Sequence, residues 1–212
     1  MRGADSNGHF TSIDDNTMQA IIDDYAWCSS WAVWMEEGEK PKSNIGDLSI
    51  FDFKKYPEIR KLLHADYIAV GLNISSDSES SKFGNFHSSS PSAQDYKLRY
   101  AFQGTPIWGC YLTDILKDFQ EPSSAKVKKY IKEHPNKLQP HFDHFKEEVR
   151  LLGAENSLFL GMGGLATRLL RQALPRDAKV IQIRHYSDFI GREKYRKEVL
   201  DALRLIGISV DA

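Results

Sequence analysis

Two polar residues with the means to do chemistry stand at the ends of strand-like segments, more than a hundred positions apart. Asn73 ends the apolar run of residues 66–73, and His185 follows the run of residues 179–183. An asparagine amide can hold a water molecule or a substrate hydroxyl in a fixed orientation, although it is not a strong base. An imidazole can donate a hydrogen bond to a developing anion. Each residue taken singly is also consistent with a structural role at a turn.

A glycine-rich stretch, residues 161–166 (GMGGLA), has the form of the dinucleotide-binding fingerprint, and Asp188 follows it. That fingerprint belongs after the first strand of a nucleotide-binding fold, whereas only about fifty residues remain after it here, so we exclude this interpretation. Two explanations remain. The stretch opens a helix whose free N–H groups can meet a phosphate, or its glycines permit tight packing of a strand on a helix.

Serine-hydrolase and metal chemistry find little support in the sequence. There is no GxSxG motif, so the serines of residues 75–92 lack the strained turn that would expose a nucleophile. His134, His141 and His144 have part of a metal-binding spacing, but no cysteine or nearby acidic cluster completes a ligand set. Cys28 and Cys110 form no CxxC pair. We therefore expect no metal ion, no cofactor and no disulfide framework.

Strand-like and helix-like segments alternate along the chain after residue 65. Strands are predicted over residues 66–73, 107–116, 157–160 and 179–183, and helices over residues 93–102, 121–135, 141–152, 165–173 and 192–205. The alternation predicts an α/β fold, a three-layer α/β/α arrangement with a mostly parallel central sheet. Sites in such sheets lie beyond the carboxyl ends of the strands, which selects Asn73, Asp114 and residues 161–164 and 185–188.

Residues 1–65 are predicted to form a helical arm packed on a core of residues 66–212, within one compact domain. The first helix is expected to run from residue 15 or 16 to about residue 37, with one apolar face and a second face marked by Trp27, Trp31 and Trp34. Two apolar faces favour a helix clamped in the core, and an aromatic surface for stacking bases is the alternative. A short helix is predicted over residues 56–63. This arm is also the expected contact for any protein partner.

The composition fits a protein without membrane contacts. Hydrophobic residues make up 41% of the 212 positions, and no apolar run is long enough to cross a bilayer. The N-terminal residues lack the apolar stretch of a signal peptide, so the predicted location is cytoplasmic. Residues 1–96 carry 8 Lys and Arg against 15 Asp and Glu, whereas residues 97–212 carry 20 against 14. This asymmetry is consistent with a basic face for a polyanion, although solvated lysine-rich helices explain it as well.

Four short motifs, in this order, resemble those of the uracil-DNA glycosylase superfamily, above all its mismatch-specific thymine/uracil branch. Residues 71–75 (GLNIS) resemble its first motif, and residues 109–114 (GCYLTD) resemble the middle strand, whose end reads the base. Residues 157–166 (SLFLGMGGLA) are similar to the strand–glycine–helix unit before the last motif, and residues 185–187 (HYS) resemble its His-Pro-Ser motif. The resemblance covers residues 66–206 and lies in the joint order and spacing of the motifs.

The resemblance implies a uracil-DNA glycosylase-like fold and a monofunctional DNA glycosylase, an N-glycosyl hydrolase of DNA repair by base excision. Such an enzyme cleaves the N-glycosidic bond of a damaged or deaminated base after the nucleotide is flipped out of DNA. By resemblance, Asn73 positions the attacking water and His185 stabilises the leaving base. The implied base-binding residues are Asp114, Phe83, Phe86 and Gly71. The implied DNA-binding residues are Ser187, Phe189, Ile190, Arg184, Arg192 and Lys194, of which Phe189 and Ile190 are candidates to fill the gap left by the flipped nucleotide.

The chain departs from the family pattern at three positions. Ile74 and Tyr186 replace prolines that stiffen the loops gripping DNA. Asp114 replaces an asparagine that recognises uracil with a donor and an acceptor; an ionised aspartate only accepts, which suits a base edge rich in N–H groups. Two alternatives therefore stay open. One is a catalytically inactive nucleic-acid or protein binder with the same fold, and the other is an enzyme acting on free nucleosides or nucleotides.

Overall fold

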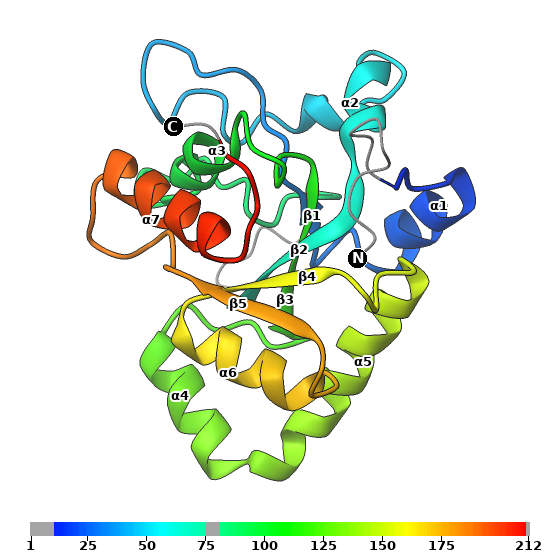
Figure 1. Cartoon of the computed structure of the whole chain (residues 1–212), viewed down its shortest axis with the longest axis vertical. Coiled ribbons are helices and arrows are strands. Elements are labelled where there is room, and N and C mark those ends of the chain that lie inside the picture. Colours follow the sequence, from blue (N-terminus) through cyan, green and yellow to red (C-terminus); the bar gives the residue numbers. More distant parts are fainter. Residues whose placement is uncertain (1–10, 75–80, 211–212) are drawn as a thin grey trace.

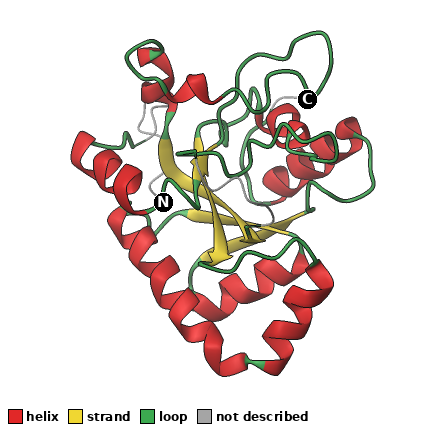
Figure 2. Ribbon diagram, turned by 180° about the vertical axis from the view of Figure 1, so that it is seen from behind, coloured by secondary structure: helices red, strands yellow, loops and turns green. Residues whose placement is uncertain are grey.

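The computed structural model describes residues 11–74 and 81–210, and its centre is a five-stranded sheet (Figure 1, Figure 2). The strand order is β1-β3-β2-β4-β5. Strand β1 (Ser30–Trp31) pairs antiparallel with β3. The other four strands run parallel: β2 (His64–Asn73), β3 (Cys110–Leu116), β4 (Leu158–Met162) and β5 (Lys179–Ile183). The segments that follow these four strands therefore meet at one edge of the sheet.

Helices cover both faces of the sheet and make three layers (Figure 1). One side carries α1 (Asp15–Asp24), α4 (Ser124–Glu133), α5 (Leu138–Leu151) and α6 (Gly164–Ala173). The other side carries α3 (Tyr96–Phe102) and α7 (Arg192–Leu205). The connections include α2 (Pro57–Leu62) and two 3-10 turns (Leu48–Phe51 and Pro135–Lys137). The predicted α/β class with a mostly parallel sheet between helical layers is confirmed.

Strand β3 is buried along its whole length, and its side chains serve two hydrophobic cores in turn. Tyr111 and Ile115 pack in the core next to α5 and α6, whereas Leu112 packs in the core next to α3 and α7. Because side chains alternate between the faces of a strand, Thr113 points toward α5 and Asp114 toward the α3–α7 side. Strand β3 thus directs Thr113 into the core next to α5 and Asp114 to the opposite face of the sheet.

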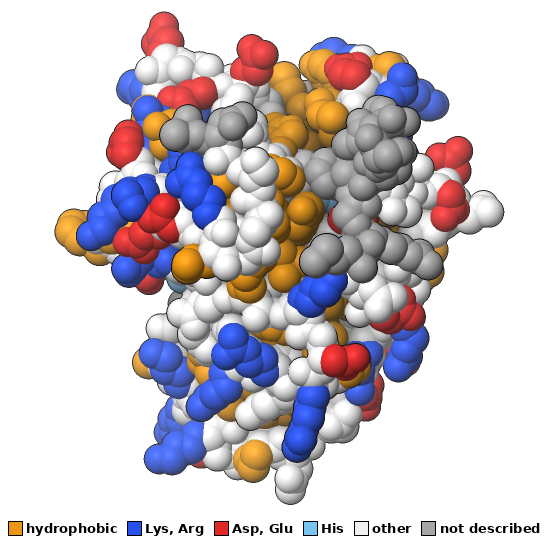
Figure 3. Space-filling model, viewed as in Figure 1, with side chains coloured by type: hydrophobic (Ala, Val, Ile, Leu, Met, Phe, Trp, Pro, Cys, Tyr) orange, Lys and Arg blue, Asp and Glu red, His pale blue; other side chains and the backbone are white. Residues whose placement is uncertain are grey.

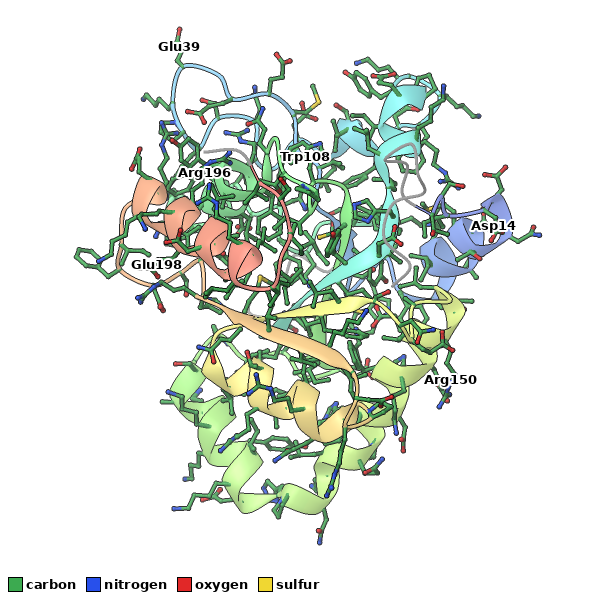
Figure 4. All side chains as sticks on the ribbon, in the orientation of Figure 1. Asp14, Glu39, Trp108, Arg150, Arg196 and Glu198 are labelled. Atoms are coloured by element: carbon green, nitrogen blue, oxygen red, sulfur yellow. The ribbon has the colours of Figure 1, made fainter. Side chains whose placement is uncertain are left out.

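Arg196 joins the two helices on the α3–α7 side of the sheet (Figure 4). Its Nη1 donates to the carbonyl oxygens of Tyr100 at 2.7 Å, Ala101 at 3.2 Å and Gln103 at 2.9 Å, all at the end of α3. The last carbonyls of a helix have no partner within that helix, and a cation there also complements the helix dipole. This contact fixes α7, and with it the loop that joins β5 to α7.

A network of fully buried polar side chains lies between β3 and α5. The carboxylate of Glu148 accepts hydrogen bonds from Tyr111 Oη at 2.8 Å and Thr113 Oγ1 at 2.9 Å, and it pairs with Lys117 Nζ at 2.6 Å. Lys117 also donates to Thr113. A charge removed from water costs several kcal/mol, and only a complete set of partners offsets that cost. Loss of any one of these four side chains would therefore leave the other buried polar groups without a complete set of partners.

The N-terminal helix is shorter than predicted. Helix α1 ends at Asp24, whereas the sequence predicted a helix to about residue 37. The chain turns over residues 25–28 and enters β1, and Ala32 N–H then donates to the carbonyl oxygen of Cys110 at 2.8 Å. Pairing with β3 and the complete burial of Trp31 outweigh the local helical spacing. Within residues 11–65, the described part of this segment, the chain thus adds a strand to the sheet as well as helices.

The remaining boundaries lie within about three residues of the predicted ones. Strand β5 and α7 coincide with the predicted ranges. Helix α4 begins at residue 124 and not at residue 121, because Ser123 caps it by accepting from Lys126 N–H. Helix α5 begins at residue 138, which places Pro140 in its first turn, where no N–H is needed. Residues 75–80 of the predicted loop of residues 75–92 lie outside the described residues, and so do all of residues 1–10. No helix of the described ranges is long and apolar enough to span a membrane.

Candidate functional site

A cleft of about 1100 Å³ opens where the parallel strands end. The three residues predicted to act on a base, Asn73, Asp114 and His185, all line this cleft. Asn73 ends β2, Asp114 lies in β3 and His185 follows β5. The rest of the lining includes the start of α6 and the segment of residues 84–95 before α3. Residues far apart in the chain meet here because their strands are parallel and adjacent.

Asn73 is held through its amide nitrogen. Nδ2 donates to the carbonyl oxygens of Ile74 at 2.9 Å, Phe119 at 3.2 Å and Glu121 at 2.9 Å. A group surrounded by three carbonyl oxygens must be a donor, so the orientation of the amide is fixed with Oδ1 on its other side. An aspartate here would set a carboxylate against those carbonyls. These hydrogen bonds therefore leave Oδ1 as the acceptor of a residue that lines the cleft.

His185 lies half-buried on the cleft wall, stacked on Tyr186 with ring centroids 4.7 Å apart. Its Nδ1 accepts from the backbone N–H of Ser187 at 3.2 Å and lies 2.7 Å from Ser187 Oγ. A backbone N–H can only donate, so Nδ1 carries no proton, and the neutral ring holds its proton on Nε2. Burial lowers the pKa of His185, an effect that Asp188 opposes. The imidazole is thus a neutral donor through Nε2.

Asp114 is buried, 2% exposed, at the base of the cleft. Its Oδ2 accepts from Nδ2 of Asn85 at 2.9 Å, and the same Nδ2 donates to the carbonyl oxygen of Cys28 at 2.9 Å. Gly71 lies opposite in the adjacent strand, where an added Cβ would be 2.2 Å from Asp114 Oδ1. Glycine at position 71 is therefore required for the carboxylate to fit.

Asn85 is a cleft residue that the sequence did not single out. It lies in the serine-rich segment, where no motif or periodicity distinguishes one polar residue from another. Both amide hydrogens of Asn85 are used by Asp114 and Cys28, so only its Oδ1 remains for a ligand. Asn85 and an ionised Asp114 together offer acceptors.

Burial raises the pKa of Asp114 to about 6, and the hydrogen bond from Asn85 opposes the rise. A carboxyl with a raised pKa in the folded state binds its proton more tightly there than in the unfolded chain. Its contribution to stability is present below the unfolded pKa of 3.8 and is lost as the pH rises through about 6.

We expect Asp114→Asn to stabilise the protein at pH 8 and to change little at pH 4. A pKa difference of this size corresponds to about 3 kcal/mol at most in the free energy of unfolding. Urea unfolding at the two pH values measures the gain. Asp143→Asn is the control, because Lys146 and Gln139 contact that exposed carboxylate and lower its pKa, so no gain is expected there. Equal unfolding free energies of Asp114→Asn and wild type at pH 8 would contradict a buried, ionised Asp114.

Of the two aromatic residues predicted to stack on a base, Phe86 lines the cleft and Phe83 does not. The ring of Phe86 packs edge to face on Tyr186, with centroids 6.3 Å apart. Phe83 lies in the core next to α5, with its ring 5.1 Å from that of Phe51. The main chain at residues 83 and 86 has φ values of 62° and 64°, and this bend sends the two rings to different sides. A stacking role thus remains with Phe86.

The loop between β5 and α7 carries the most exposed aromatic side chain of the described residues. Phe189 is fully exposed, at 107%, whereas Ile190 packs against the α3–α7 core. Lys97 of α3 fixes the loop by donating to the carbonyl oxygen of Asp188 at 2.9 Å. Of the two apolar candidates for contact with DNA, only Phe189 projects into solvent.

The three cations predicted to bind DNA differ in their surroundings. Arg184 pairs with Glu198 of α7, labelled in Figure 4, and with Asp188 at 3.2 Å. Arg192 pairs with Glu37 at 2.8 Å. Lys194 is exposed. Carboxylates offset the charge of both arginines, which leaves little net positive potential at this rim of the cleft.

The glycine-rich turn after β4 is explained by packing. An added Cβ at Gly161 would lie 2.3 Å from Thr167 Oγ1 of α6, so only glycine lets the helix approach the strand. Gly163 has a φ of 89°, which favours glycine, and its α carbon borders the side chain of His185. The start of α6 has no side-chain cap and lines the cleft. Tight strand–helix packing therefore accounts for the glycines, and the N–H groups of α6 open on the same cleft.

Among residues 11–74 and 81–210, no group of three or more His, Cys, Asp or Glu side chains could hold a metal ion. Cys28 and Cys110 are buried free thiols. No family model, curated protein or solved structure matches this chain. The chemistry is therefore inferred from the side chains that line the cleft.

Proposed function

We propose that this protein is a DNA glycosylase-like N-glycosyl hydrolase that removes a damaged or deaminated base flipped into the cleft. One observation carries the proposal: Asn73, an oriented acceptor, and His185, an oriented neutral donor, line one cleft. Hydrolysis of an N-glycosidic bond needs these two functions, one for the water and one for the departing base.

The reaction breaks the bond between C1′ of the sugar and a ring nitrogen of the base, and the electron pair leaves with the base. His185 Nε2–H donates a hydrogen bond to the base as negative charge grows on it. Asn73 Oδ1 accepts a hydrogen bond from the attacking water and directs its oxygen toward C1′. The water's hydroxyl group joins C1′, and its proton passes to the base through solvent. Asn73 need not act as a base, because C1′ carries positive charge when the water attacks.

The acceptors at the base of the cleft favour a base edge with N–H groups. Asp114 is ionised above a pH of about 6 and then only accepts, and Asn85 has only Oδ1 left. Hypoxanthine presents an N–H flanked by only one carbonyl oxygen, and xanthine presents a second ring N–H at N3, whereas the edge of uracil has a single N–H between two carbonyl oxygens. Phe86 supports the proposal as a ring on which a flat heterocycle can stack.

Phe189 supports DNA as the partner. A fully exposed phenylalanine next to the His185 segment is unfavourable in water, and it is suited to enter the space that a flipped nucleotide leaves in a duplex. Arg184 and Arg192, which carboxylates pair, contribute less to this interface than their charges suggest.

The proposal is tested by measuring base release from oligonucleotides that each carry one uracil, hypoxanthine, xanthine or ethenocytosine, as duplexes and as single strands. With enzyme in excess, alkali cleavage at the abasic site should appear with xanthine or hypoxanthine and be weaker with uracil. Lesion-free strands of the same sequence are the control. Intact strands throughout the panel would rule out the proposed activity.

Hydrolysis of free nucleosides is the second candidate, and the acidic lining of the cleft favours it. The cleft lining carries the carboxylates of Asp95, Asp114, Glu121, Asp188 and Glu198 against the cations of Lys128 and Arg184, and this negative balance disfavours phosphate groups. A free nucleoside has no phosphate. Release of free sugar from inosine or xanthosine, faster than base release from any oligonucleotide, would favour this second candidate.

A further inference from the structure

A second groove, of about 790 Å³, lies between α4, α5 and α6. Its floor is apolar and consists of the buried side chains Ile131, Leu138, Phe142 and Leu169. Its rim carries amides and cations: Asn136, Gln139, Gln172, Lys128, Lys132 and Arg168. The described residues that line this basic groove include no carboxylate.

The three cations of the basic groove have no ion-pair partner among the residues that the structure describes. Lys128 and Lys132 lie one turn apart on α4, Arg168 lies on α6, and all three are exposed. Their neighbours on α4 differ, since Lys126 pairs with Glu121 at 3.4 Å and Lys129 with Glu133 at 3.9 Å. Unpaired cations keep their full attraction for an anion.

The basic groove therefore contrasts with the rim of the cleft formed by the β5–α7 segment. At that rim, Arg184 and Arg192 are paired with carboxylates. Figure 3 shows Lys and Arg side chains gathered over α4 and α6, in the lower part of the view. The cations of the basic groove thus lie on the helical layer of α4 and α6, next to the cleft.

The basic groove lies next to the cleft, because Lys128 lines both. A strand with one nucleotide in the cleft carries its next phosphates onto the adjoining surface, and phosphates bind where cations are free. We propose that the basic groove holds the sugar-phosphate backbone of the strand whose base occupies the cleft. The phosphates contact Lys128, Lys132 and Arg168, and the sugars lie on the apolar floor. The inference rests on the proposed function for the identity of the ligand.

The test compares two double variants that lose the same charge. Lys132→Ala with Arg168→Ala removes cations of the basic groove, and Lys126→Ala with Lys129→Ala removes the ion-paired cations of α4. Fluorescence anisotropy measures the Kd for a lesion-free single strand of about 12 nucleotides between about 50 and 200 mM salt. The groove variant should bind about tenfold more weakly, with a salt slope lower by about 1.4, because each lost phosphate contact removes about 0.7. The control variant should stay within about twofold of wild type, because its charges are already paired.

Equal affinity and salt slope in the groove variant and wild type would overturn the inference, and so would equal losses in both variants. Polyglutamate that displaces the oligonucleotide at the same charge concentration would instead assign the basic groove to an acidic protein segment. The proposed activity is decided separately by base release. If no base is released but only the groove variant loses affinity, the groove inference stands and the proposed activity fails.

Discussion

Replacing His185 with alanine is expected to lower the rate of base release by about 10²–10³, the usual loss when one preorganised donor to a developing anion is removed. A contact that is already present in the free protein orients the imidazole ring for this role. Ser187 N–H donates to Nδ1, so the proton of the neutral ring is on Nε2 before substrate binds. Alanine removes that donor and keeps the Cβ atom.

Single-turnover kinetics with excess enzyme measure this loss without a contribution from product release. Ser187→Ala is the matched control, because it removes the hydroxyl group at 2.7 Å from Nδ1 but keeps the backbone N–H that sets the tautomer. We expect the control to lose less than about tenfold, in line with the loss of one neutral hydrogen bond. Asn73→Ala should resemble His185→Ala, with oligonucleotide binding retained in both. A His185→Ala rate close to wild type would contradict the role assigned to His185.

Replacing Lys117 with methionine is expected to lower the free energy of unfolding by about 3–5 kcal/mol, because it leaves the buried carboxylate of Glu148 without its cation. Both side chains are at most 1% exposed, so water cannot take the place of the lost partner. Tyr111 and Thr113 still donate to Glu148, but they are neutral and cannot balance the charge. Urea unfolding followed by circular dichroism measures the loss.

Two comparisons isolate the buried charge as the cause. The double variant of Lys117→Met and Glu148→Leu removes both charges and should recover most of the loss. Lys129→Ala breaks the exposed pair with Glu133 and should cost about 1 kcal/mol or less. If the double variant were as unstable as Lys117→Met alone, lost packing and not an unpaired charge would be the cause.

The elements with a strong local pattern could be predicted from the sequence. Strand β5 is a short segment rich in the β-branched residues Val180, Ile181 and Ile183, and α7 repeats its apolar residues at helical spacing, so the local pattern identified both. The predicted extension of the first helix to about residue 37 was wrong because distant contacts outweighed the local pattern. Residues 25–37 carry apolar side chains at a spacing that fits a helix, but Trp31 is buried by pairing with β3, a segment about eighty positions away.

Some residues of the candidate site could likewise be predicted from the sequence, and others could not. Asn73, Asp114 and His185 could be selected because each lies in or just after the C-terminal part of a strand of a parallel sheet, and such strand ends converge. Phe83 and Phe86 could not be distinguished, because their directions depend on a bend in a loop. Asn85 could not be found, because its contact with Asp114 joins a loop to a strand that lie far apart in the sequence.

By itself, the sequence determined which residue types were available and, through periodicity, the strands whose ends hold Asn73, Asp114 and His185. Those properties are local, since they depend on neighbours within a few positions. Only the tertiary structure decided that Asn73 must be an amide, that His185 carries its proton on Nε2, and that Arg184 is paired while Lys132 and Arg168 are free. The physical reason is that protonation, orientation and net charge depend on partners within a few ångströms, and folding brings those partners from distant parts of the chain.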